Sequence, residues 1–341
     1  MRTKWTEALL DERLATPSEA LVGDFRELDG DLMVLGAGGK VGPTLCRLAR
    51  NAVKRSGKER RVIAVSRFSD PKTAEALNDC GVETIRADLL APGALQALPD
   101  AENVVYMAGK KFNTVGHEAG TWASNAWLAS RAAERYQNSR ITVFSTGNVY
   151  PLVPVSSGGA TEQTPPRPVG EYAMSCLARE RMFEYAAQTF GTRVAIFRLS
   201  YAVDLRYGVL SDLAHDILAG KPISLSSPCF NCIWQGYASE IALRSLLKAD
   251  SGVFRLNVTG PETVPVRRTA EKLGELLGKE PAFSGEETGT AYLSNAGRMC
   301  RIFGYPDVPL ETLIEWQAQW IGDGGRNLGK PTHFEERGGN Y

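Results

Sequence analysis

A glycine-rich loop between a short apolar run and a longer helical pattern constrains the fold of this chain most strongly. The loop, LGAGGKVG at 35–42, follows the run DLMVLG and opens the amphipathic stretch KVGPTLCRLARNAVKRS. Gly36, Gly39 and Gly42 permit a tight turn, close approach of the backbone to a pyrophosphate, and close packing of the helix on the strand. The first amide groups of the helix would then face the phosphates. The loop predicts a dinucleotide-binding strand, turn and helix.

The residues after the loop alternate between short β-branched runs and longer amphipathic ones. RRVIAVSR, VETIRAD, NVVYMAG, RITVFSTG and RVAIFRLS are the expected strands, and WASNAWLASRAAERYQ and EYAMSCLARERMFEYAAQ are among the expected helices. This order predicts right-handed βαβ crossovers and an α/β fold with a Rossmann-type, doubly wound parallel sheet.

The chain divides into four expected parts. Residues 31–200 form the dinucleotide-binding Rossmann domain, and 201–321 form mainly a smaller, partly interleaved substrate-binding domain. VFRLNVTG predicts a strand near 254–260 that returns to the Rossmann sheet. Residues 1–30 are an amino-terminal extension. The tail, 322–341, is rich in glycine and charge, which is typical of an extended arm, a lid or a disordered end.

Composition excludes several classes of partner. Lys plus Arg and Asp plus Glu both number 39, so no net field favours nucleic acid or an anionic membrane. No run approaches the roughly 20 apolar residues of a membrane span, and the first thirty residues lack the apolar core of a signal peptide. Six scattered cysteines suit reduced thiols and a cytoplasmic location. The pair Cys229 and Cys232 has no second ligand pair near it in sequence, so no metal site is expected.

The end of the second strand bears on the choice of cofactor. A site specific for NAD usually has an acid there that holds the ribose 2′-hydroxyl. Here Ser66 and Arg67 occupy that place, and a hydroxyl and a guanidinium suit a 2′-phosphate, with Lys40 of the glycine loop adding positive charge. NADP is therefore expected, with NAD as the alternative. Arg67 also fits a solvated loop charge.

With these residues in place, the chain resembles the extended short-chain dehydrogenase/reductases, the NAD-dependent epimerase/dehydratase family, from about residue 31 to 320. LGAGGKVG is similar to the family's TGxxGxxG, and Asp88 in RADL resembles its adenine-side aspartate. FSTGNVYP is similar to the segment that carries the catalytic Ser or Thr, here Thr146. ATEQTPPRPVGEY resembles the loop that leads to the catalytic tyrosine, here Tyr172.

The resemblance implies a set of site residues and a class of reaction. It implies hydride transfer on a sugar-like, polyhydroxylated substrate, and homodimers are common in the family. The expected cofactor contacts are Gly36, Gly38, Gly39, Lys40, Val41, Gly42, Ser66, Arg67, Asp88, Leu89, Ala108 and Gly109. The expected catalytic group is Thr146, Tyr172, Lys110, Lys111, Asn125 and Cys176. By their place in the resemblance, Arg206, Trp234 and Gln235 are candidate substrate contacts, and a packing role fits them equally.

The helix of Tyr172 departs from the family pattern. The family's tyrosine is followed four residues later by a lysine, which lies on the same helix face and lowers the pKa of the phenol. Here that position is Cys176, and neither a thiol nor a thiolate supplies positive charge. Cys176 fits either a nucleophile or a small packing residue. Lys110 or Lys111, directly after the fourth strand, is expected to supply the charge or to bind an anionic substrate, and Arg179 ranks lower.

Two functions follow from these residues. The first is an NAD(P)-dependent epimerase, dehydratase or dehydrogenase in which Tyr172 moves a proton and Thr146 polarises the substrate oxygen. The second is a catalytically inactive regulatory or sensing protein of the same fold, which the Cys176 change favours. Retention of Thr146, Tyr172 and Asn125 together favours the enzyme.

Overall fold

A seven-stranded parallel sheet forms the base of the molecule. The computed structural model describes residues 4–250 and 252–340. Its sheet has the order β12-β7-β5-β4-β1-β2-β3, and every neighbouring pair is parallel. The strands are β1 (Leu32–Leu35), β2 (Val62–Ser66), β3 (Glu83–Arg86), β4 (Asn103–Tyr106), β5 (Arg140–Thr146), β7 (Arg193–Leu199) and β12 (Val253–Val258). This arrangement confirms the expected doubly wound sheet and the strand expected near 254–260.

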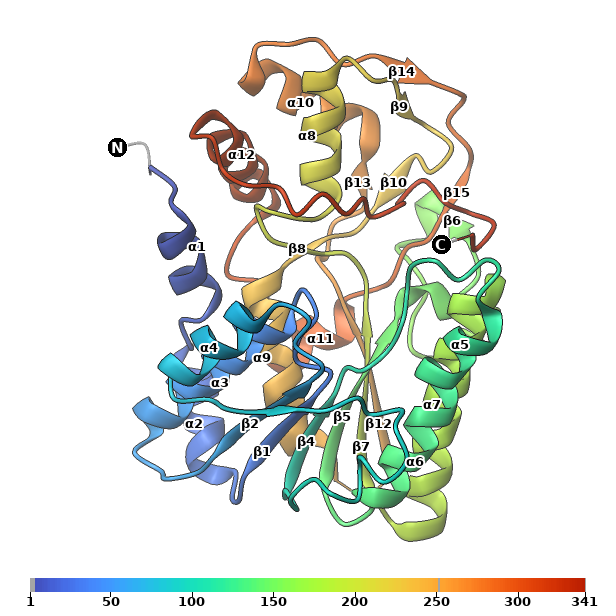
Figure 1. Ribbon diagram of the computed structural model, residues 1–341. Coiled ribbons are helices and arrows are strands. Elements are labelled where there is room, and N and C mark those ends of the chain that lie inside the picture. The colour runs from blue at the N-terminus through green and yellow to red at the C-terminus, as the bar shows by residue number, and fades with distance from the viewer. Residues whose placement is uncertain (1–3, 251, 341) are drawn as a thin grey trace.

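Helices cover both faces of the sheet (Figure 1). The helices α2 (Glu19–Glu27), α3 (Gly42–Ser56) and α9 (Gln235–Arg244) contribute to one core, and α6 (Leu128–Arg135) and α7 (Gly170–Phe190) contribute to the other. The short α4 (Pro71–Asp79) contacts α3 and β3. Because both faces are covered, β1, β4 and most of β5 are fully buried, which their continuous apolar runs anticipate.

The amino-terminal extension is part of the folded core. Its helix α1 (Glu7–Leu14) buries Leu10 and Leu14, and α2 packs on α3. Trp5 is buried and its ring meets that of Trp316 edge-on, with centroids 5.1 Å apart. The extension therefore joins the Rossmann layer to the helices above it.

A smaller layer lies above the carboxyl edge of the sheet. It contains α8 (Val209–Ala219), α10 (Val266–Leu277) and α12 (Leu310–Gly322), while α11 (Gly297–Phe303) packs near β12. Four pairs of short strands lie in this upper part or at its border with the sheet: β6 (Val153–Pro154) with β15 (Thr290–Ala291), β8 (Ala202–Val203) with β11 (Ile233–Trp234), β9 (Ile223–Ser224) with β14 (Phe283–Ser284), and β10 (Cys229–Phe230) with β13 (Val264–Pro265).

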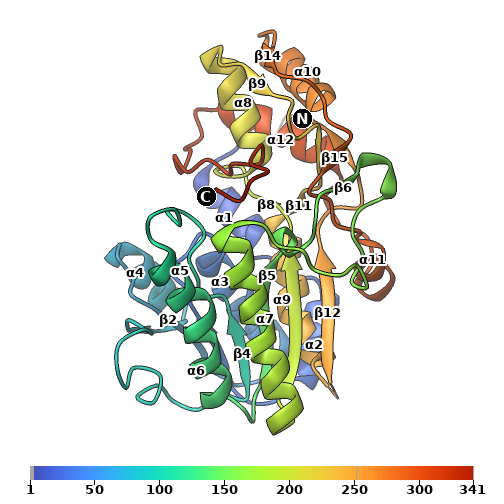
Figure 2. The same ribbon diagram turned by 90° about the vertical axis from the view of Figure 1, so that its right-hand side faces the viewer.

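The carboxy-terminal tail crosses between the two layers. Residues 323–340 contain no helix or strand, and they run from α12 beneath α8 toward β6 and β15 (Figures 1 and 2). The tail is anchored along its length, since Thr332 is only 2% exposed and Phe334 is only 7% exposed. Of the expected forms of the tail, the lid describes this arrangement.

One expected helix is interrupted. The stretch WASNAWLASRAAERYQ falls on the end of α5 (Glu118–Trp122), a π-helical turn at Ala123–Trp127, and α6. The π turn carries Asn125, whose side chain is fully buried. Single π turns inside helices often mark functional sites, because they redirect one side chain out of the regular repeat.

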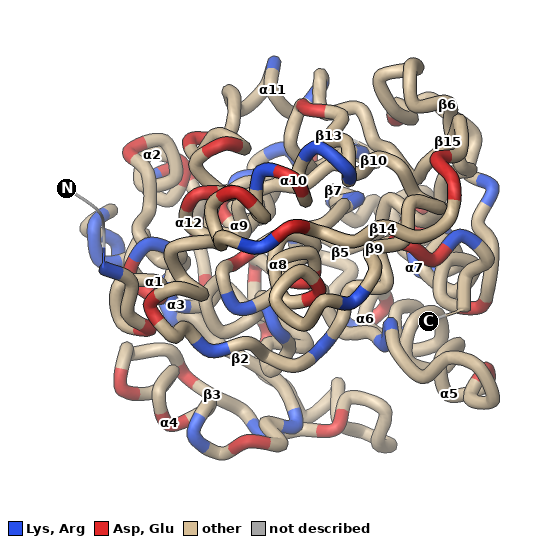
Figure 3. Tube along the Cα trace, turned by 90° about the horizontal axis from the view of Figure 1, so that it is seen from above, with Lys and Arg blue, Asp and Glu red and all other residues tan. Residues whose placement is uncertain are grey.

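Acidic and basic side chains are mixed along the chain (Figure 3), as their equal numbers suggest. Among the described residues, no helix is long and apolar enough to cross a bilayer. No group of three or more potential metal ligands occurs among residues 4–250 and 252–340.

Candidate active site

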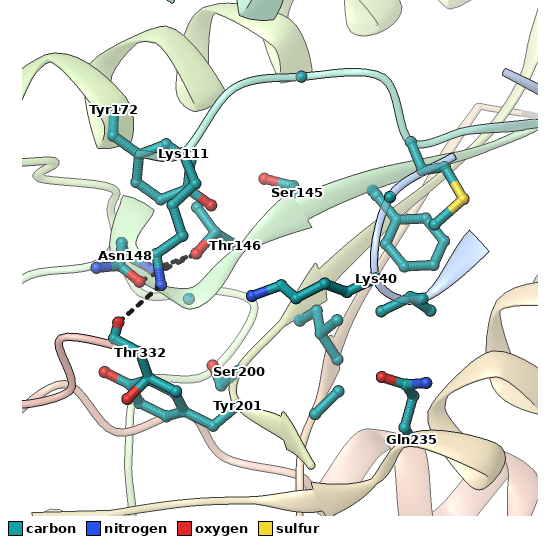
Figure 4. Close-up of a pocket in the computed structure, with 18 of the residues that line it drawn as sticks. Lys40, Lys111, Ser145, Thr146, Asn148, Tyr172, Ser200, Tyr201, Gln235 and Thr332 are labelled. Carbon is teal, nitrogen blue, oxygen red and sulfur yellow. Dashed lines mark hydrogen bonds between the residues drawn. The ribbon is translucent and has the colours of Figure 1, made fainter. Parts of the chain in front are cut away.

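A cavity of about 280 Å³ lies at the carboxyl ends of the central strands. The glycine loop, the end of β5 and the start of α7 form its walls, and the tail residue Thr332 also lines it. Lys111 and Tyr172 enter from one side and Lys40 from the other (Figure 4). We call this space the inner cavity. Its position, at the point where strand order reverses between β1 and β4, is where ligands bind in open α/β sheets.

A second space, the outer cavity, lies beside the inner one. It is lined by Ser66, Arg67 and Asp88, as the sequence predicts, and by Lys330 of the tail, which the sequence did not single out. Four residues line both cavities: Gly36, Gly39, Met107 and Gly109. A ligand long enough to span both would therefore pass over the glycine loop.

The close backbone approach at the loop fits a dinucleotide. Gly36 has φ +91°, and a Cβ there would lie 2.6 Å from Ala108 Cα. A Cβ on Gly38 would lie 2.5 Å from Ser66 Oγ. Neither position has room for a side chain, and the loop backbone leads directly into α3, whose first amides are available to phosphates. Ser66, Arg67 and Asp88 would face the adenosine end.

Lys40 does not lie where the sequence suggested. Its side chain lines the inner cavity and not the outer one, so it does not add charge beside Ser66 and Arg67. The ammonium lies 3.1 Å from the centroid of the Tyr207 ring and 5.1 Å from that of Phe112. Burial, reinforced by the nearby charge of Lys111, lowers the pKa of Lys40 to about 7.

Asn125 ties the loop after β4 to helix α7. Its Oδ1 accepts from Lys110 N at 2.8 Å, and its Nδ2 donates to Lys110 O at 2.9 Å and to Ser175 Oγ at 2.9 Å. The expected asparagine is therefore buried and fully bonded rather than exposed on the surface. Its contacts fix the backbone of Lys110, and with it the direction in which the next residue, Lys111, enters the cavity.

Arg179 occupies the space beneath this loop. It is 6% exposed, and its guanidinium donates to Asn125 O at 3.2 Å, to Asn125 Oδ1 at 2.7 Å and to Phe144 O at 2.8 Å. Within the described part of the chain, Arg179 forms no ion pair with a carboxylate. The sequence ranked Arg179 below the loop lysines because it lies two turns from Tyr172, but its long side chain reaches the inner cavity.

Lys111 enters the cavity alongside Tyr172 (Figure 4). Its Nζ donates to Thr332 O of the tail at 3.2 Å. Burial lowers the pKa of Lys111 to about 8, while Asp212, Cys176 and Glu335 act in the opposite direction. The lysine is therefore mostly charged at neutral pH, and of the two loop lysines it is the one whose side chain approaches the tyrosine.

Thr146 ends β5 and caps the short turn that follows. Its Oγ1 accepts from Asn148 N at 3.2 Å and donates to Asn148 Oδ1 at 3.0 Å. Thr146, Asn148 and Tyr172 all line the inner cavity. Asn148 was missed in the sequence, although a Thr-x-Asn pattern at a strand end is a local turn signal. The threonine hydroxyl is held at the cavity wall with a polar partner that can exchange for a substrate oxygen.

Cys176 is not placed as a catalyst. It is 1% exposed, does not line either cavity, and packs with Val149, Tyr150 and Ala160. Burial raises the pKa of its thiol. The structure favours the packing role over a nucleophile, because the thiol is buried, lines neither cavity and is hydrogen-bonded to the side chain of Tyr172.

Two of the three expected substrate contacts lie outside the inner cavity. Arg206 pairs with Asp204, Asp11 and Glu7, because the amino-terminal helix packs against its loop. Trp234 is buried, with its ring 5.6 Å from that of Trp316. Both are packing residues, which corrects the expectation.

Gln235 does line the inner cavity. Its Nε2 donates to Thr44 Oγ1 of α3 at 3.1 Å, so one end of the side chain is tied to the Rossmann layer. This is the one expected substrate contact of the three that the fold brings to the cavity wall.

A buried ion pair holds α7 against the sheet. Glu180 accepts from Arg198 Nη2 at 2.6 Å and from Ser145 Oγ at 2.5 Å, and Arg198 Nη1 donates to Tyr150 OH at 2.7 Å. Glu180 is fully buried and Arg198 is 2% exposed. The pair fixes the helix that carries Tyr172 relative to β5, which carries Thr146.

These features can be compared with known proteins. The family model described as NAD dependent epimerase/dehydratase family matches residues 32–228, more than half of the chain. The chain belongs to this family. The expected resemblance is thereby confirmed, and the family is one of enzymes. No sequence among the curated proteins matches the chain.

Solved structures share the fold. UDP-glucuronic acid 4-epimerase from Bacillus cereus is 18% identical, with a TM-score of 0.70 over 86% of this chain and 99% of that one. dTDP-glucose 4,6-dehydratase from Bacillus anthracis str. Ames, in complex with NAD, is 17% identical, with a TM-score of 0.70 over 86% and 97%. MoeE5, in complex with UDP-glucose and NAD, is 22% identical, with a TM-score of 0.66 over 86% and 99%.

This member of the NAD dependent epimerase/dehydratase family has an unusual cation arrangement. The expected lysine position is Cys176, and the cations at the inner cavity are Lys40, Lys110, Lys111 and Arg179. Lys40 comes from the glycine loop and Arg179 from α7, so they reach the cavity from opposite layers of the Rossmann fold. The sequence signal for Arg179 was its seven-residue spacing from Tyr172, which preserves the helix face.

Proposed function

We propose that this enzyme transfers a hydride between NADP and a polyhydroxylated, sugar-like substrate, as an epimerase, dehydratase or dehydrogenase. Tyr172 is the proton donor or acceptor, and Thr146 polarises the substrate oxygen. The observation that carries the proposal is that Tyr172, Thr146 and Lys111 line one cavity, which shares its glycine-loop wall with the outer cavity. A dinucleotide lying across that wall would bring its reactive end to Tyr172.

The proton chemistry falls to residues of this chain. When bound, the nicotinamide ring supplies or accepts the hydride. Tyr172 takes the proton from the substrate hydroxyl as its carbon is oxidised, and returns a proton when a carbonyl is reduced. A free phenol titrates near 10, and each unit of lowered pKa corresponds to about 1.4 kcal/mol. Lys111 lines the same cavity as Tyr172, and its ammonium would favour the phenolate, as the lysine of the family pattern does.

Arg179 has a different task from Lys111. The guanidinium of Arg179 is held in place by hydrogen bonds to three carbonyl oxygens, two of which belong to Asn125. It holds Asn125, and Asn125 holds the backbone at Lys110. We therefore assign Arg179 as a positioning residue for the loop, and Lys111 as the group that tunes Tyr172.

The preference for NADP rests on the outer cavity. Ser66 and Arg67 line it, with Lys330 of the tail as a further cation. Among the lining residues, Asp70 accepts from Lys72 N at 3.1 Å as the cap of α4, so it is already bonded. We expect tighter binding of NADP than of NAD, and loss of this preference in Arg67→Ala, measured by isothermal titration with both cofactors. A cytoplasmic location and a homodimer stay predictions.

Hydride transfer tests the proposal directly. Wild type, Tyr172→Phe and Tyr185→Phe are mixed with NADP⁺ and a panel of sugars and sugar acids. Absorbance at 340 nm reports net oxidation, and NMR and mass spectrometry of the products report epimerisation or loss of water, in which the cofactor is regenerated. Tyr185 is a matched control, since it lies on the same helix and is 59% exposed. Tyr172→Phe should reduce turnover by at least about 100-fold without changing NADP affinity. Unchanged turnover would remove Tyr172 from the mechanism. Cofactor binding with no turnover of any sugar would favour the regulatory alternative.

A further inference from the structure

We propose that the substrate is a free polyhydroxy acid of monosaccharide size, that Lys40 binds its carboxylate, and that the tail excludes nucleotide-linked sugars. This inference rests on the proposed function and adds the substrate class to it. It depends on the charge of the inner cavity, on the path of the tail, and on the polar groups that remain for a substrate.

The inner cavity holds two ammonium groups near one aromatic ring. Lys40 Nζ lies 5.1 Å from the centroid of Phe112, and Lys111 Nζ lies 5.2 Å from it. Burial first, and then the charges of Lys111 and Lys330, lower the pKa of Lys40 to about 7. A bound anion would relieve the repulsion among these charges and restore the charge of Lys40.

The nearby carboxylates are already engaged. Asp204 accepts from Arg206 N at 2.7 Å and from its guanidinium at 3.0 Å. Asp212 accepts from Thr332 N at 2.7 Å and from Thr332 Oγ1 at 2.6 Å. Lys330 is the other charge that acts on Lys40, and it is a further cation. Among these charged neighbours, none forms an ion pair with Lys40 in the described chain.

Lys40 is directed away from the expected phosphate path. The glycine backbone and the start of α3 face that path, whereas the Lys40 ammonium lies over Tyr207, from the loop before α8. Lys40 also lines the cavity of Tyr172 and not the one of Ser66. The Lys40 ammonium is therefore placed to bind an anion of the substrate beside Tyr207 and not the phosphates of the cofactor.

The tail closes the inner cavity on its upper side. Thr332 lines it, and Lys111 and Asp212 both bond to that residue. Residues 330, 331, 334 and 335 line a separate cavity on the far side of the tail, beside α8. The tail thus divides the space between α8 and the sheet into two parts.

The end of the tail is anchored near the catalytic helix. Arg337 donates to Thr290 O at 2.6 Å and to Thr290 Oγ1 at 2.7 Å. Gly339 then packs against Gly170, the first residue of α7, where a Cβ on Gly170 would lie 2.4 Å from Gly339 O. The tail is thereby fixed from α8 to two residues before Tyr172.

The remaining space suits a small polar molecule. The inner cavity, at about 280 Å³, is near the lower end of ligand pockets, which run from about 300 to 1,000 Å³. The nicotinamide end of the cofactor would take part of this volume, which leaves no room for a nucleoside diphosphate. Ser200 and Ser294, whose hydroxyls bond to each other at 3.0 Å, line its wall together with Tyr201 and Tyr292. Tyr292 OH donates to Arg337 O at 3.3 Å. Hydroxyls both donate and accept, so this wall suits a polyhydroxylated carbon chain.

A carboxylate fits the cations better than a phosphate does. Phosphate sites commonly use a guanidinium fork or several backbone amides. The guanidinium at this cavity, Arg179, is already bonded to three carbonyl oxygens. Lys111 is bonded to Thr332 O and serves Tyr172 in the proposed function, so the anion would meet the single ammonium of Lys40, which matches a monoanion.

Binding measurements separate this inference from the proposed function. Isothermal titration is carried out on the full chain and on Tyr172→Phe, each saturated with NADP⁺. The probes are D-glucuronate, D-galacturonate, D-gluconate, D-glucose, glucose 6-phosphate and UDP-glucuronate.

At least one of the three free acids should bind at least about tenfold more tightly than D-glucose and UDP-glucuronate. Lys40→Met should remove that advantage and leave NADP affinity within about twofold. Lys58→Met, in the exposed turn that follows α3, should have no effect.

Each outcome has one meaning. Binding of an acid without turnover would refute the proposed function and support the substrate class. Tighter binding or turnover of UDP-glucuronate would overturn the substrate class and leave hydride transfer intact. Preference for glucose 6-phosphate, or failure of all three acids to bind, would also overturn it. An unchanged acid affinity in Lys40→Met would remove Lys40 from recognition.

A shortened chain tests the tail. Deletion of 329–341 removes Thr332 and Arg337 but keeps Leu328, whose amide bonds to Arg206 O. The deletion variant, if folded by circular dichroism, should bind UDP-glucuronate. Thr332→Val, which loses one bond to Asp212, should weaken acid binding in the full chain without admitting the nucleotide. Exclusion of UDP-glucuronate from the folded deletion variant would show that the tail does not set the size limit.

Discussion

Arg179 grips Asn125 at two points, from Nε to the main-chain oxygen at 3.2 Å and from Nη2 to Oδ1 at 2.7 Å. The two residues are 54 positions apart and come from adjacent helical segments on one face of the sheet. A Cβ on Gly109 would lie 2.2 Å from Arg179 Nη2, so the loop above has no room for a side chain there. The bonds between Arg179 and Asn125 therefore fix the position of the loop after β4 that carries Lys111.

Removal of the Arg179 guanidinium should affect both stability and rate. Arg179→Met removes the guanidinium that bonds to Asn125 O, Asn125 Oδ1 and Phe144 O, and of these Asn125 Oδ1 keeps its bond from Lys110 N. We therefore expect a loss of about 2–4 kcal/mol in the free energy of unfolding. Because the loop loosens, kcat should fall more than KM rises. Urea unfolding and steady-state kinetics measure these effects. Arg181→Met, on the same helix but half exposed, should change stability by no more than about 0.5 kcal/mol. Equal effects of the two substitutions would contradict the positioning role.

Replacement of Cys176 by lysine should destabilise the protein, because the residues around position 176 leave no room for a charged side chain. Cys176 is packed with Val149, Tyr150 and Ala160, and Arg179 already acts on its pKa. Cys176→Lys should therefore cost about 1–3 kcal/mol of stability through overpacking and like charge. Arg179→Ala itself costs stability, but the double variant should lose less than the sum of the two single losses, because removal of Arg179 frees space for the new lysine and removes the repulsion. A double-mutant cycle by thermal unfolding gives the coupling energy, and simple additivity of the two losses would show that the residues do not compete.

Lys111 should set the alkaline limit of activity. Its pKa is lowered to about 8, so the charge that favours the Tyr172 phenolate is lost above that pH. We expect kcat/KM to fall above about pH 8 in the wild type. Lys111→Arg, which stays charged, should move that limit upward, and Lys111→Met should lower activity at pH 7 and flatten the alkaline limb. Profiles of kcat/KM between pH 5 and 10 test this prediction. If the alkaline fall in kcat/KM does not move in Lys111→Arg, that fall belongs to another titrating group.

Lys40 should lower stability in a pH-dependent way. Its pKa of about 7 in the folded chain lies below the ordinary 10.5, so between these values the unfolded chain binds more protons. Stability from this group therefore rises with pH from 7 to 10.5, and the full penalty applies below pH 7. Lys40→Met should stabilise the protein by about 1 kcal/mol at pH 6, after allowance for solvent screening, and by progressively less above pH 7. Urea unfolding at pH 6, 8 and 10 tests this, and a gain that grows with pH would contradict it.

The sequence located most of the residues that meet at the site. Local patterns sufficed for the glycine loop, the parallel strands and the ends of β4 and β5, because alternation of short and long apolar segments largely specifies a doubly wound sheet. Thr146, Tyr172, Lys110 and Lys111 all reach the inner cavity, as residues at the carboxyl edge of such a sheet should.

Local sequence patterns did not predict the direction of side chains or the packing between distant segments. Lys40 lies in the expected loop but points to the other cavity, because Tyr207 and Phe112 form its surroundings. For Arg206 the sequence left a substrate contact and a packing role equally open, and its ion pairs with Glu7 and Asp11 of the amino-terminal helix decide for packing. No local pattern encodes such contacts between segments about 200 residues apart.

The sequence by itself determined the fold and the family, because these depend on residue type and on spacing along the chain. Only the tertiary structure decided which cations face the tyrosine and how large the cavity is. The reason is that both depend on where distant segments pack: Arg179 reaches the loop through the π turn at Asn125, and the tail closes the cavity through Thr332 and Gly339.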